Sequence, residues 1–311
     1  MGRSGRQAEI EAQIEGLRAD LAEANRRLEA QLGILGRLER RMEHTQGLAG
    51  RAYERQGRWP ERLASLRQHP EYEQAFSGEP LVSIRIGTYN NAEGLCERAL
   101  ASVRAQTYEH WEAVVVGDAT EDDTKERIGS LGDPRIRFWN LPFRAPMPDD
   151  PESRYMLTGV APFNAAADAA TGSWIAPIDD DDFWEEDHIE VLMRAAQEEH
   201  AELAYGRMRV LLEGSQGATE FGAWPPRAGD FGFQAAIYHA HLKEFQYDMN
   251  AWLADEVADW NLARRMWEAG IRFTFVDRIV GTYYVSSGHH HREGWEGRLA
   301  ERPLREPGDP D

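Results

Sequence analysis

Hydrophobic residues recur near the start of the chain in alternating steps of four and three. This heptad spacing predicts an α-helix with one apolar seam, and we assign residues 1–46 to a coiled-coil region. The seam needs another helix to bury it, so we expect a homo-oligomer formed through residues 10–42; the alternative is that the helix folds back on the rest of the chain. A polar residue, Gln31, takes one core position of the repeat. The apolar members are Ile10, Ile14, Leu17, Leu21, Ala24, Leu28, Leu35, Leu38 and Met42.

The pattern changes after residue 80. Glycines and prolines punctuate residues 47–80, which predicts a connector with short helical pieces. Over residues 81–290, short apolar runs alternate with amphipathic stretches, which predicts an α/β domain with a mainly parallel sheet and helices on both faces. The tail 291–311, rich in Pro, Gly and charge, is expected to be flexible. We expect strands at 81–88, 111–117, 135–140, 174–178 and 272–284, helices at 92–106, 121–131, 158–170, 185–200 and 253–269, and less regular β segments at 204–212 and 231–238.

The charge of the chain is unevenly distributed. The formal net charge is −19, yet residues 1–70 hold 13 Lys/Arg against 10 Asp/Glu, so the remainder carries 22 against 44. Such an acidic field repels nucleic acid, so we expect no nucleic-acid partner. The sequence has no apolar run long enough to span a bilayer and no signal-like start, and its one cysteine is Cys96. We therefore expect a cytoplasmic protein without an integral membrane segment.

Four consecutive carboxylates, Asp179 to Asp182, follow the apolar run 174–178. Ligands of parallel α/β sheets bind beyond the carboxyl ends of the strands. Like charges crowded at the end of a buried strand are costly unless a hard cation binds them, and oxygen-only ligation suits Mn²⁺ or Mg²⁺. The alternative for an acidic run is a solvated loop.

The first two predicted strands also end in polar residues. Thr88, Asn90 and Asn91 follow the first strand, and Asp118 follows the second. Because the carboxyl ends of parallel strands meet at one edge of a sheet, we expect these side chains near the carboxylates. Taken singly, each of Asn90, Asn91 and Asp118 can also be explained as the cap of a following helix.

Several further segments occur in a fixed order along the chain. They are Val-Ser-Ile-Arg-Ile-Gly-Thr-Tyr-Asn at 82–90, Arg-Ala-Leu-Ala-Ser-Val-Arg-Ala-Gln-Thr-Tyr at 98–108, the strand and acidic turn 111–124, Asp-Pro-Arg-Ile-Arg-Phe at 133–138, the segment 170–184 that contains the four aspartates, and Ala-Asp-Trp-Asn-Leu at 258–262. Together, over roughly residues 80–290, they resemble glycosyltransferase family 2, which comprises inverting enzymes with the GT-A fold, and the segment 170–184 resembles its metal-binding segment. The resemblance implies a Rossmann-like nucleotide-sugar half at 81–183 and an acceptor half at 184–290.

The resemblance assigns roles on the donor side. Thr88 and Asp118 would hold the nucleotide base, with Asp118 accepting from the imide N–H of uracil or thymine. Asp180 would contact the ribose. Asp181 would bind the metal ion that bridges the two phosphates, with Asp179 as the other acid of an Asp-X-Asp pattern.

The resemblance also assigns a general base, Asp259, in the Ala-Asp-Trp motif. Asp255 and Glu256 lie close by on the same predicted helix and are ranked behind it, because a continuous helix would carry Asp255 and Asp259 on one face. Arg154 lies where some members place a phosphate- or base-binding arginine. The histidines at 289–291 are read either as a metal or phosphate contact or as a solvated cluster.

Three positions depart from the pattern of the family. Gly117 stands where an Asp is common, Phe163 precedes Asn164 in place of an Arg, and Ala258 stands where the later motif has Glu. The expected function is metal-dependent, inverting transfer of a sugar from a nucleoside diphosphate sugar, of the UDP or dTDP type, to an unidentified acceptor hydroxyl on a saccharide, a peptide or a small molecule. A non-catalytic nucleotide- or metal-binding scaffold and a nucleotidyltransferase stay as alternatives.

Overall fold

The computed structural model describes residues 15–18, 20–38, 59–215, 217–287, 292 and 294–296. The chain divides into two units, 1–53 and 54–311, and each is described by itself. In the first unit, residues 15–18 and 20–38 are helical, as the heptad pattern predicts. The seam leucines Leu17, Leu21, Leu28 and Leu35 are 53–68% exposed. Three further seam positions lie outside the described residues: Ile10, Ile14 and Met42.

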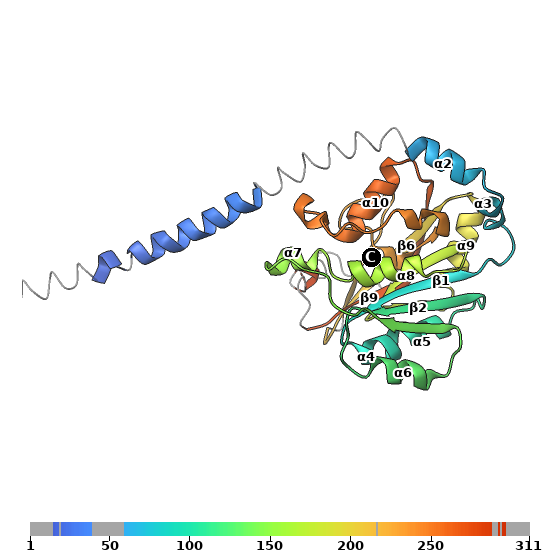
Figure 1. The fold of residues 1–311 in the computed structure, drawn as a ribbon, viewed down its shortest axis with the longest axis horizontal. Coiled ribbons are helices and arrows are strands. Elements are labelled where there is room, and N and C mark those ends of the chain that lie inside the picture. The colour runs from blue at the N-terminus through green and yellow to red at the C-terminus, as the bar shows by residue number, and fades with distance from the viewer. Residues whose placement is uncertain are drawn as a thin grey trace, which may run out of the picture. The chain divides into compact units, whose positions relative to one another are not determined.

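One sheet runs through the second unit (Figure 1). In the part of the chain that the structure describes, it has nine strands, in the order β3-β2-β1-β4-β8-β6-β9-β5, with β7 paired to β6. The strands are β1 (Val82–Thr88), β2 (Trp111–Gly117), β3 (Ile136–Asn140), β4 (Trp174–Asp179), β5 (Phe183–Trp184), β6 (Leu203–Leu212), β7 (Ala218–Phe221), β8 (Ala236–His239) and β9 (Phe273–Val285).

The two halves of the sheet differ in strand direction. Strands β3, β2, β1 and β4 are all parallel, and Val82 of β1 lies opposite both Trp111 and Trp174. In the second half β9 runs parallel to β6, whereas β8 is antiparallel to β4 and β6, and β5 and β7 are antiparallel to their neighbours. The predicted α/β architecture is confirmed. Of the antiparallel pairs only β6 and β7 are joined by a short turn, and the other antiparallel strands pair over long stretches of chain.

The helices lie between the strands much as the sequence predicts. The segment 92–104 is one continuous helical stretch with a wider, π-type turn at its centre. The helical segments are α2 (Trp59–Arg67), α3 (Pro70–Gln74), α4 (Ala92–Gly94), η1 (Leu95–Ala99), α5 (Leu100–Arg104), α6 (Thr124–Leu131), α7 (Pro151–Tyr155), α8 (Val160–Asp168), α9 (His188–Glu198), η2 (Phe233–Ala235), η3 (Ala240–Glu244), η4 (Ala251–Ala254) and α10 (Ala258–Glu268).

Strand β1 shows how the core is divided between the two faces of the sheet. Val82, Ile84 and Ile86 point to one face, where they join a core cluster with residues of η1, α5 and α9. The intervening side chains point to the other face, because neighbours along a strand alternate. One of these is Arg85, which is only 2% exposed. Figure 1 shows α8 and α10 on one side of the sheet and α4, α5 and α6 on the other.

The helices α2 and α3, within the predicted connector, belong to the second unit and pack onto the rest of it. Leu63 and Tyr72 are buried. Arg67 donates two hydrogen bonds to Glu202, at 2.8 and 2.7 Å, and the Tyr72 hydroxyl donates a third to it at 2.7 Å. These contacts fix both helices against the start of β6. None of the helices in the described ranges is long and apolar enough to cross a membrane.

Candidate active site

The carboxyl end of β4 carries the four aspartates into the turn before β5. Burial, followed by the negative charges of Asp259 and Asp181, raises the pKa of Asp179 well above its usual range. Burial and the neighbouring Asp180 raise the pKa of Asp181 to about 7. Arg98 opposes this shift, and its side chain donates a hydrogen bond to the backbone carbonyl of Asp181 at 3.0 Å. Negative charge is therefore concentrated and poorly balanced at this edge of the sheet.

The other two aspartates of the run are tied to the protein. Asp180 accepts a hydrogen bond from the Asn91 side chain at 3.0 Å. The Thr88 hydroxyl also lowers the pKa of Asp180, against the larger effect of burial, but its geometry is not that of an ordinary hydrogen bond. Asp182 is fully buried and accepts from the backbone N–H of Tyr284 at 2.9 Å. It thus links the β4–β5 turn to β9.

The donor set at this edge fits a hard divalent ion. Asp179 and Asp181 offer only oxygen atoms, and their raised pKa values reflect charge that a cation would stabilise. Among the described residues, these aspartates do not form a group of three carboxylates within 4.8 Å of one another. Mg²⁺ and similar ions are commonly held by one or two carboxylates plus substrate phosphates, which matches an incomplete protein shell.

Asp118 lies at the end of β2, and its side chain is 4% exposed. One of its carboxylate oxygens accepts from Arg144 at 3.0 Å, and the other, Oδ1, is buried with no hydrogen-bond partner among the described residues. The Arg144 guanidinium lies 3.7 Å from the centre of the Tyr89 ring. A buried acceptor beside an aromatic ring and a cation can receive an N–H donor of a planar heterocycle.

Asp259 lies in the first turn of α10, where the positive end of the helix dipole favours a carboxylate. Both of its oxygens are held: Oδ1 accepts from the Tyr247 hydroxyl at 2.8 Å, and Oδ2 accepts from the backbone N–H of Phe233 at 2.9 Å. Its charge also raises the pKa of Asp179, so the two carboxylates are electrostatically close. The structure therefore brings the predicted base to the predicted metal-binding edge.

A buried cation lies beneath these carboxylates. Arg85 donates to the Tyr247 hydroxyl at 2.9 Å, and its guanidinium lies 4.4 Å from the ring centre of Phe163 and 4.8 Å from that of Tyr247. Its Nε and Nη1 atoms have no hydrogen-bond partner among the described residues. The charge of Arg85 opposes the rise in the pKa of Asp179. Arg85, Tyr247 and Asp259 thus form a chain of contacts from the core to the site.

The prediction of one continuous helix through Asp255 and Asp259 is wrong. Asp255 ends η4 with a φ of +60°, a left-handed conformation that stops the helix, and α10 begins only at Ala258. Asp255 and Asp259 therefore do not share a helix face. Glu256 is held by Arg264, with contacts of 2.7 and 2.8 Å, and by the Asn261 side chain at 2.7 Å. The structure thus gives Glu256 a binding partner that the sequence reading did not foresee.

The predicted ligand contacts of Arg154 and of the histidines at 289–291 are not seen at the aspartate edge among the described residues. Arg154 is exposed and donates to the backbone carbonyls of Pro148 and Asp149, at 3.1 and 3.0 Å, within its own loop. The histidines at 289–291 lie outside the described residues. Tyr155 and Tyr283, by contrast, form a pair close to the aspartates, because Asp179 acts on the pKa of both tyrosines.

The sequence of this domain can now be set beside those of known families. Residues 83–145 and 159–223 match the model of Glycosyl transferase family 2. This part of the chain is therefore similar to glycosyl transferases of family 2. The matched residues include β1, β2 and β4 with the aspartates that follow them.

Characterised relatives share part of this domain. The chain is 27% identical over 135 residues to a UDP-Glc:α-D-GlcNAc-diphosphoundecaprenol β-1,3-glucosyltransferase, WfgD, of Escherichia coli, covering 43% of this chain and 48% of the relative. It is 31% identical over 137 residues to the succinoglycan biosynthesis protein ExoO of Rhizobium meliloti, covering 44% and 36%. The chain thus spans half or less of the length of these relatives.

Solved structures support the fold. The S. aureus TarS structure in complex with UDP-GlcNAc has a TM-score of 0.52 at 17% identity, covering 67% of this chain and 60% of that one. The mannosyltransferase PcManGT from Pyrobaculum calidifontis, in complex with GDP-Man and Mn²⁺, has a TM-score of 0.52 at 17% identity, covering 74% and 68%. The predicted GT-A type of fold is confirmed.

The three departures from the family 2 pattern have structural explanations. A side chain at Gly117 would lie 2.4 Å from Oδ1 of Asn140, whose amide holds the backbone of Thr120 in place. The Phe163 ring fills the space over Gly87 and stacks on Arg85. Ala258 is buried at the start of α10, where a glutamate would be costly.

Sequence reasoning missed Arg85, Arg144 and Tyr247. The signal for Arg85 was present, because an arginine within an otherwise apolar strand must be either exposed or paired. Arg144 and Tyr247 lie in irregular segments, where neither period nor spacing marks them. Their roles became visible only through the contacts that they make with Asp118 and Asp259.

Proposed function

We propose that this chain is an inverting glycosyltransferase that moves a sugar from a nucleoside diphosphate sugar to an acceptor hydroxyl, with Mn²⁺ or Mg²⁺ as cofactor. The observation that carries the proposal is the placement of Asp259. Its carboxylate is held by Tyr247 and by the backbone of Phe233, and it interacts electrostatically with Asp179 at the end of β4. A fixed carboxylate beside a metal-binding edge suits a single displacement at the anomeric carbon.

In this reaction Asp259 accepts the proton of the acceptor hydroxyl as its oxygen attacks the sugar. Asp181 and Asp179 would hold the divalent ion, and the bound ion would supply stabilisation of the negative charge on the departing diphosphate. No second carboxylic acid is needed to protonate the leaving group, in contrast to a glycosidase. Arg85 limits the repulsion between the carboxylates from below.

The donor is assigned through Asp118 and its surroundings. The unpartnered Oδ1 of Asp118 offers an acceptor for the imide N–H of uracil or thymine, so we favour a UDP or dTDP sugar. The relative WfgD is named for UDP-Glc, and TarS was solved with UDP-GlcNAc, which supports this choice. PcManGT was solved with GDP-Man, so guanosine diphosphate sugars belong in the same test.

The test is an isothermal calorimetric titration of nucleotide sugars into the protein, with and without Mn²⁺. We expect binding of a uridine or thymidine diphosphate sugar that weakens at least tenfold when Mn²⁺ is removed. Asp181→Ala should lose the metal-dependent part of the affinity and keep its Tm, because it removes one of several repelling charges. Glu186→Ala is the matched control, since Glu186 is exposed and lies in the same turn region.

Two results would contradict the donor and metal assignment. One is undiminished Mn²⁺-dependent affinity in Asp181→Ala. The other is binding of a nucleoside triphosphate in preference to every diphosphate sugar, which would favour the nucleotidyltransferase alternative. Donor binding with no transfer to any saccharide, peptide or small-molecule acceptor would favour a non-catalytic scaffold.

We further propose that two copies of the chain associate through residues 10–42. The exposed leucines Leu17, Leu21, Leu28 and Leu35 recur at heptad spacing, and a matching helix would bury them. Light scattering of the full-length chain should report a dimer at micromolar concentration. Replacing both Leu21 and Leu28 by Asp should give a monomer. A wild-type chain that is already monomeric under these conditions would rule the association out.

A further inference from the structure

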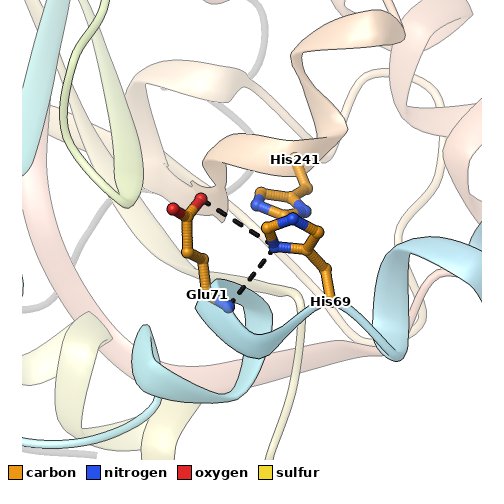
Figure 2. Close-up of side chains that lie close together, drawn as sticks. All are labelled: His69, Glu71 and His241. Carbon is orange, nitrogen blue, oxygen red and sulfur yellow. Dashed lines mark hydrogen bonds and ion pairs between the residues drawn. The ribbon is translucent and has the colours of Figure 1, made fainter.

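Three side chains that can bind a metal meet near the amino end of β4, where His239 pairs with Trp174, whereas the aspartate run begins at the carboxyl end of this strand. His69 precedes α3, Glu71 is in its first turn, and His241 lies in η3, about 170 residues later in the chain. Figure 2 shows the two imidazole rings close together, with the Glu71 carboxylate beside them; the ring centres lie 5.6 Å apart and the ring planes are inclined at 61°. One ligating atom from each residue lies within 4.8 Å of the other two.

The contacts within this group leave ligand atoms available. His69 Nδ1 lies 3.8 Å from the Glu71 carboxylate and accepts the Glu71 backbone N–H at 3.4 Å, a long and weak capping contact. The Nδ1 atom of His241 is buried and has no hydrogen-bond partner among the described residues. Buried imidazole nitrogens are usually paired, so an unpartnered one that faces a second imidazole needs an explanation.

A fourth residue, His239, orients the group without joining it. Its Nδ1 accepts the backbone N–H of His241 at 3.2 Å, and its Nε2 lies 3.2 Å from the Tyr72 carbonyl. Both ring nitrogens of His239 are therefore engaged, and its ring stacks on Tyr72 with the centres 4.6 Å apart. This arrangement fixes the start of η3 against α3 and leaves His241 directed at His69.

The chemistry of the group differs from that of the aspartate edge. Two imidazoles and one carboxylate form a ligand set that suits Zn²⁺ or a similar transition metal, whereas oxygen-only ligands suit Mg²⁺ and Mn²⁺. A neutral imidazole nitrogen is the form of histidine that binds a metal, and the buried Nδ1 of His241 has no competing partner among the described residues. His69 and Glu71 are exposed, so their side chains can move inward to the bonding distance of about 2.0–2.2 Å.

We propose that His69, Glu71 and His241 form a binding site for one divalent transition metal ion, for which Zn²⁺ is the reference, with water in the remaining position. The site joins the start of α3 to η3 and so fastens the segment before the sheet to the acceptor half. It is separate from the aspartate edge in both position and ligand type. Its existence does not depend on the proposed transferase activity.

The experiment is a titration of Zn²⁺ into the metal-free, full-length chain against a chromophoric chelator. Three consecutive histidines at 289–291 offer competing zinc ligands, so the titration is run in a chain in which all three are replaced by Ala, as well as in the wild type. We expect one high-affinity Zn²⁺ per chain to persist in that triple variant. At a Zn²⁺ concentration about 100-fold above its Kd, the Tm should rise by roughly 5–10 °C.

Single substitutions then locate the ion. His69→Ala and His241→Ala, each in the triple-variant chain, should weaken Zn²⁺ binding by about 100-fold or more and abolish the rise in Tm. Glu71→Gln should weaken binding by about tenfold. His200→Asn is the matched control, because His200 also lies 3.6 Å from a glutamate, Glu73, but has no second histidine as a ligand partner in the described group. Asparagine tolerates the positive φ of this position.

Three outcomes would overturn the proposal. In the first, the triple variant shows no high-affinity Zn²⁺ binding, so the metal belongs to the tail histidines alone. In the second, zinc affinity is equal in His241→Ala and its parent while circular dichroism shows both folded. Loss of Zn²⁺ binding in Asp181→Ala instead of His241→Ala would place the ion at the aspartate edge and would likewise contradict the assignment.

Discussion

Burial acts in the same direction on the pKa of the carboxylates of Glu202 and Asp179, yet their pKa values are shifted in opposite directions. Burial would raise the pKa of Glu202, but hydrogen bonds from Arg67, the Arg272 backbone and Tyr72 outweigh it, and the pKa is lowered. At the end of β4, burial and neighbouring negative charges act in the same direction and raise the pKa of Asp179. A buried charge that is fully paired stabilises a fold, whereas one that is left among like charges marks a place where a ligand supplies the missing partner.

Partners, and not burial, separate Glu202 from the aspartates at the end of β4. Glu202 has a side chain that is only 1% exposed, yet its neighbours satisfy both of its oxygens. Asp259 belongs with these aspartates by position, although Tyr247 and the Phe233 backbone hold it. Substitutions at Glu202 should therefore alter stability, and substitutions at Asp259 and these aspartates should alter catalysis.

The largest effect is expected at Asp259. Asp259→Asn keeps the size of the side chain but cannot accept a proton, so kcat should fall by about 10²–10⁴-fold with donor affinity nearly unchanged. Turnover and calorimetric donor binding measure the two effects separately. Asp255→Asn, on the other side of the helix break, serves as the control and should keep near-normal turnover. A dead Asp255→Asn beside an active Asp259→Asn would mean that the base has been assigned to the wrong residue.

A change of similar size, but in stability, is expected at Glu202. Glu202→Gln leaves Arg67 partly buried without its partner and should lower the free energy of unfolding by about 2–3 kcal/mol. Urea unfolding at pH 7 measures this, and Glu199→Gln, an exposed neighbour, should change it by less than about 0.5 kcal/mol. Transfer activity of the folded protein should be maintained.

The pH dependence of that difference follows from the sign of the pKa shift. Because the pKa of Glu202 is lowered in the folded state, its stabilisation is fully present above the unfolded pKa of about 4.3 and is lost as the pH falls through the folded pKa. The gap between wild type and Glu202→Gln should therefore be constant from pH 7 to pH 5 and narrow below about pH 4.3. If the difference in the free energy of unfolding between wild type and Glu202→Gln narrows near pH 7 instead, the titration of another group controls that difference.

Much of the parallel half of the domain was predictable from sequence for a physical reason. Buried parallel strands read as continuous apolar runs, and their polar ends must meet at one edge, which located Asp118 and Asp179. The acceptor half was less predictable. Its strands mix directions, and the break at Asp255 depends on a left-handed residue that neither composition nor period reveals. Tyr247 reaches Asp259 from an irregular segment, so only the three-dimensional contacts identify it.

Arg85 illustrates the same limit from within a predicted strand. The sequence places it in an apolar run, but its role depends on what α8 and the segment around Tyr247 bring over it. Its guanidinium stacks on Phe163, donates to Tyr247 and has two nitrogens without a partner among the described residues. A buried cation with unpaired donors is costly to the fold, and such groups are typical of functional sites.

The smallest effect is expected at Arg85, where it tests whether this residue serves catalysis or stability. Arg85→Met keeps the length of the side chain and removes its charge, so it should lower kcat by about tenfold, the size of one hydrogen bond to a charged group. Tyr247→Phe should lower kcat by a similar factor, since it removes the bond to Asp259. Donor affinity should change little in either variant, and the Tm of Arg85→Met should be maintained or raised because the unpaired donors are gone. Arg85→Lys, which keeps the charge, should recover part of the lost kcat. If Arg85→Met instead lowers Tm and kcat together, and Arg85→Lys restores only the Tm, then Arg85 belongs with Glu202 among the residues that hold the fold.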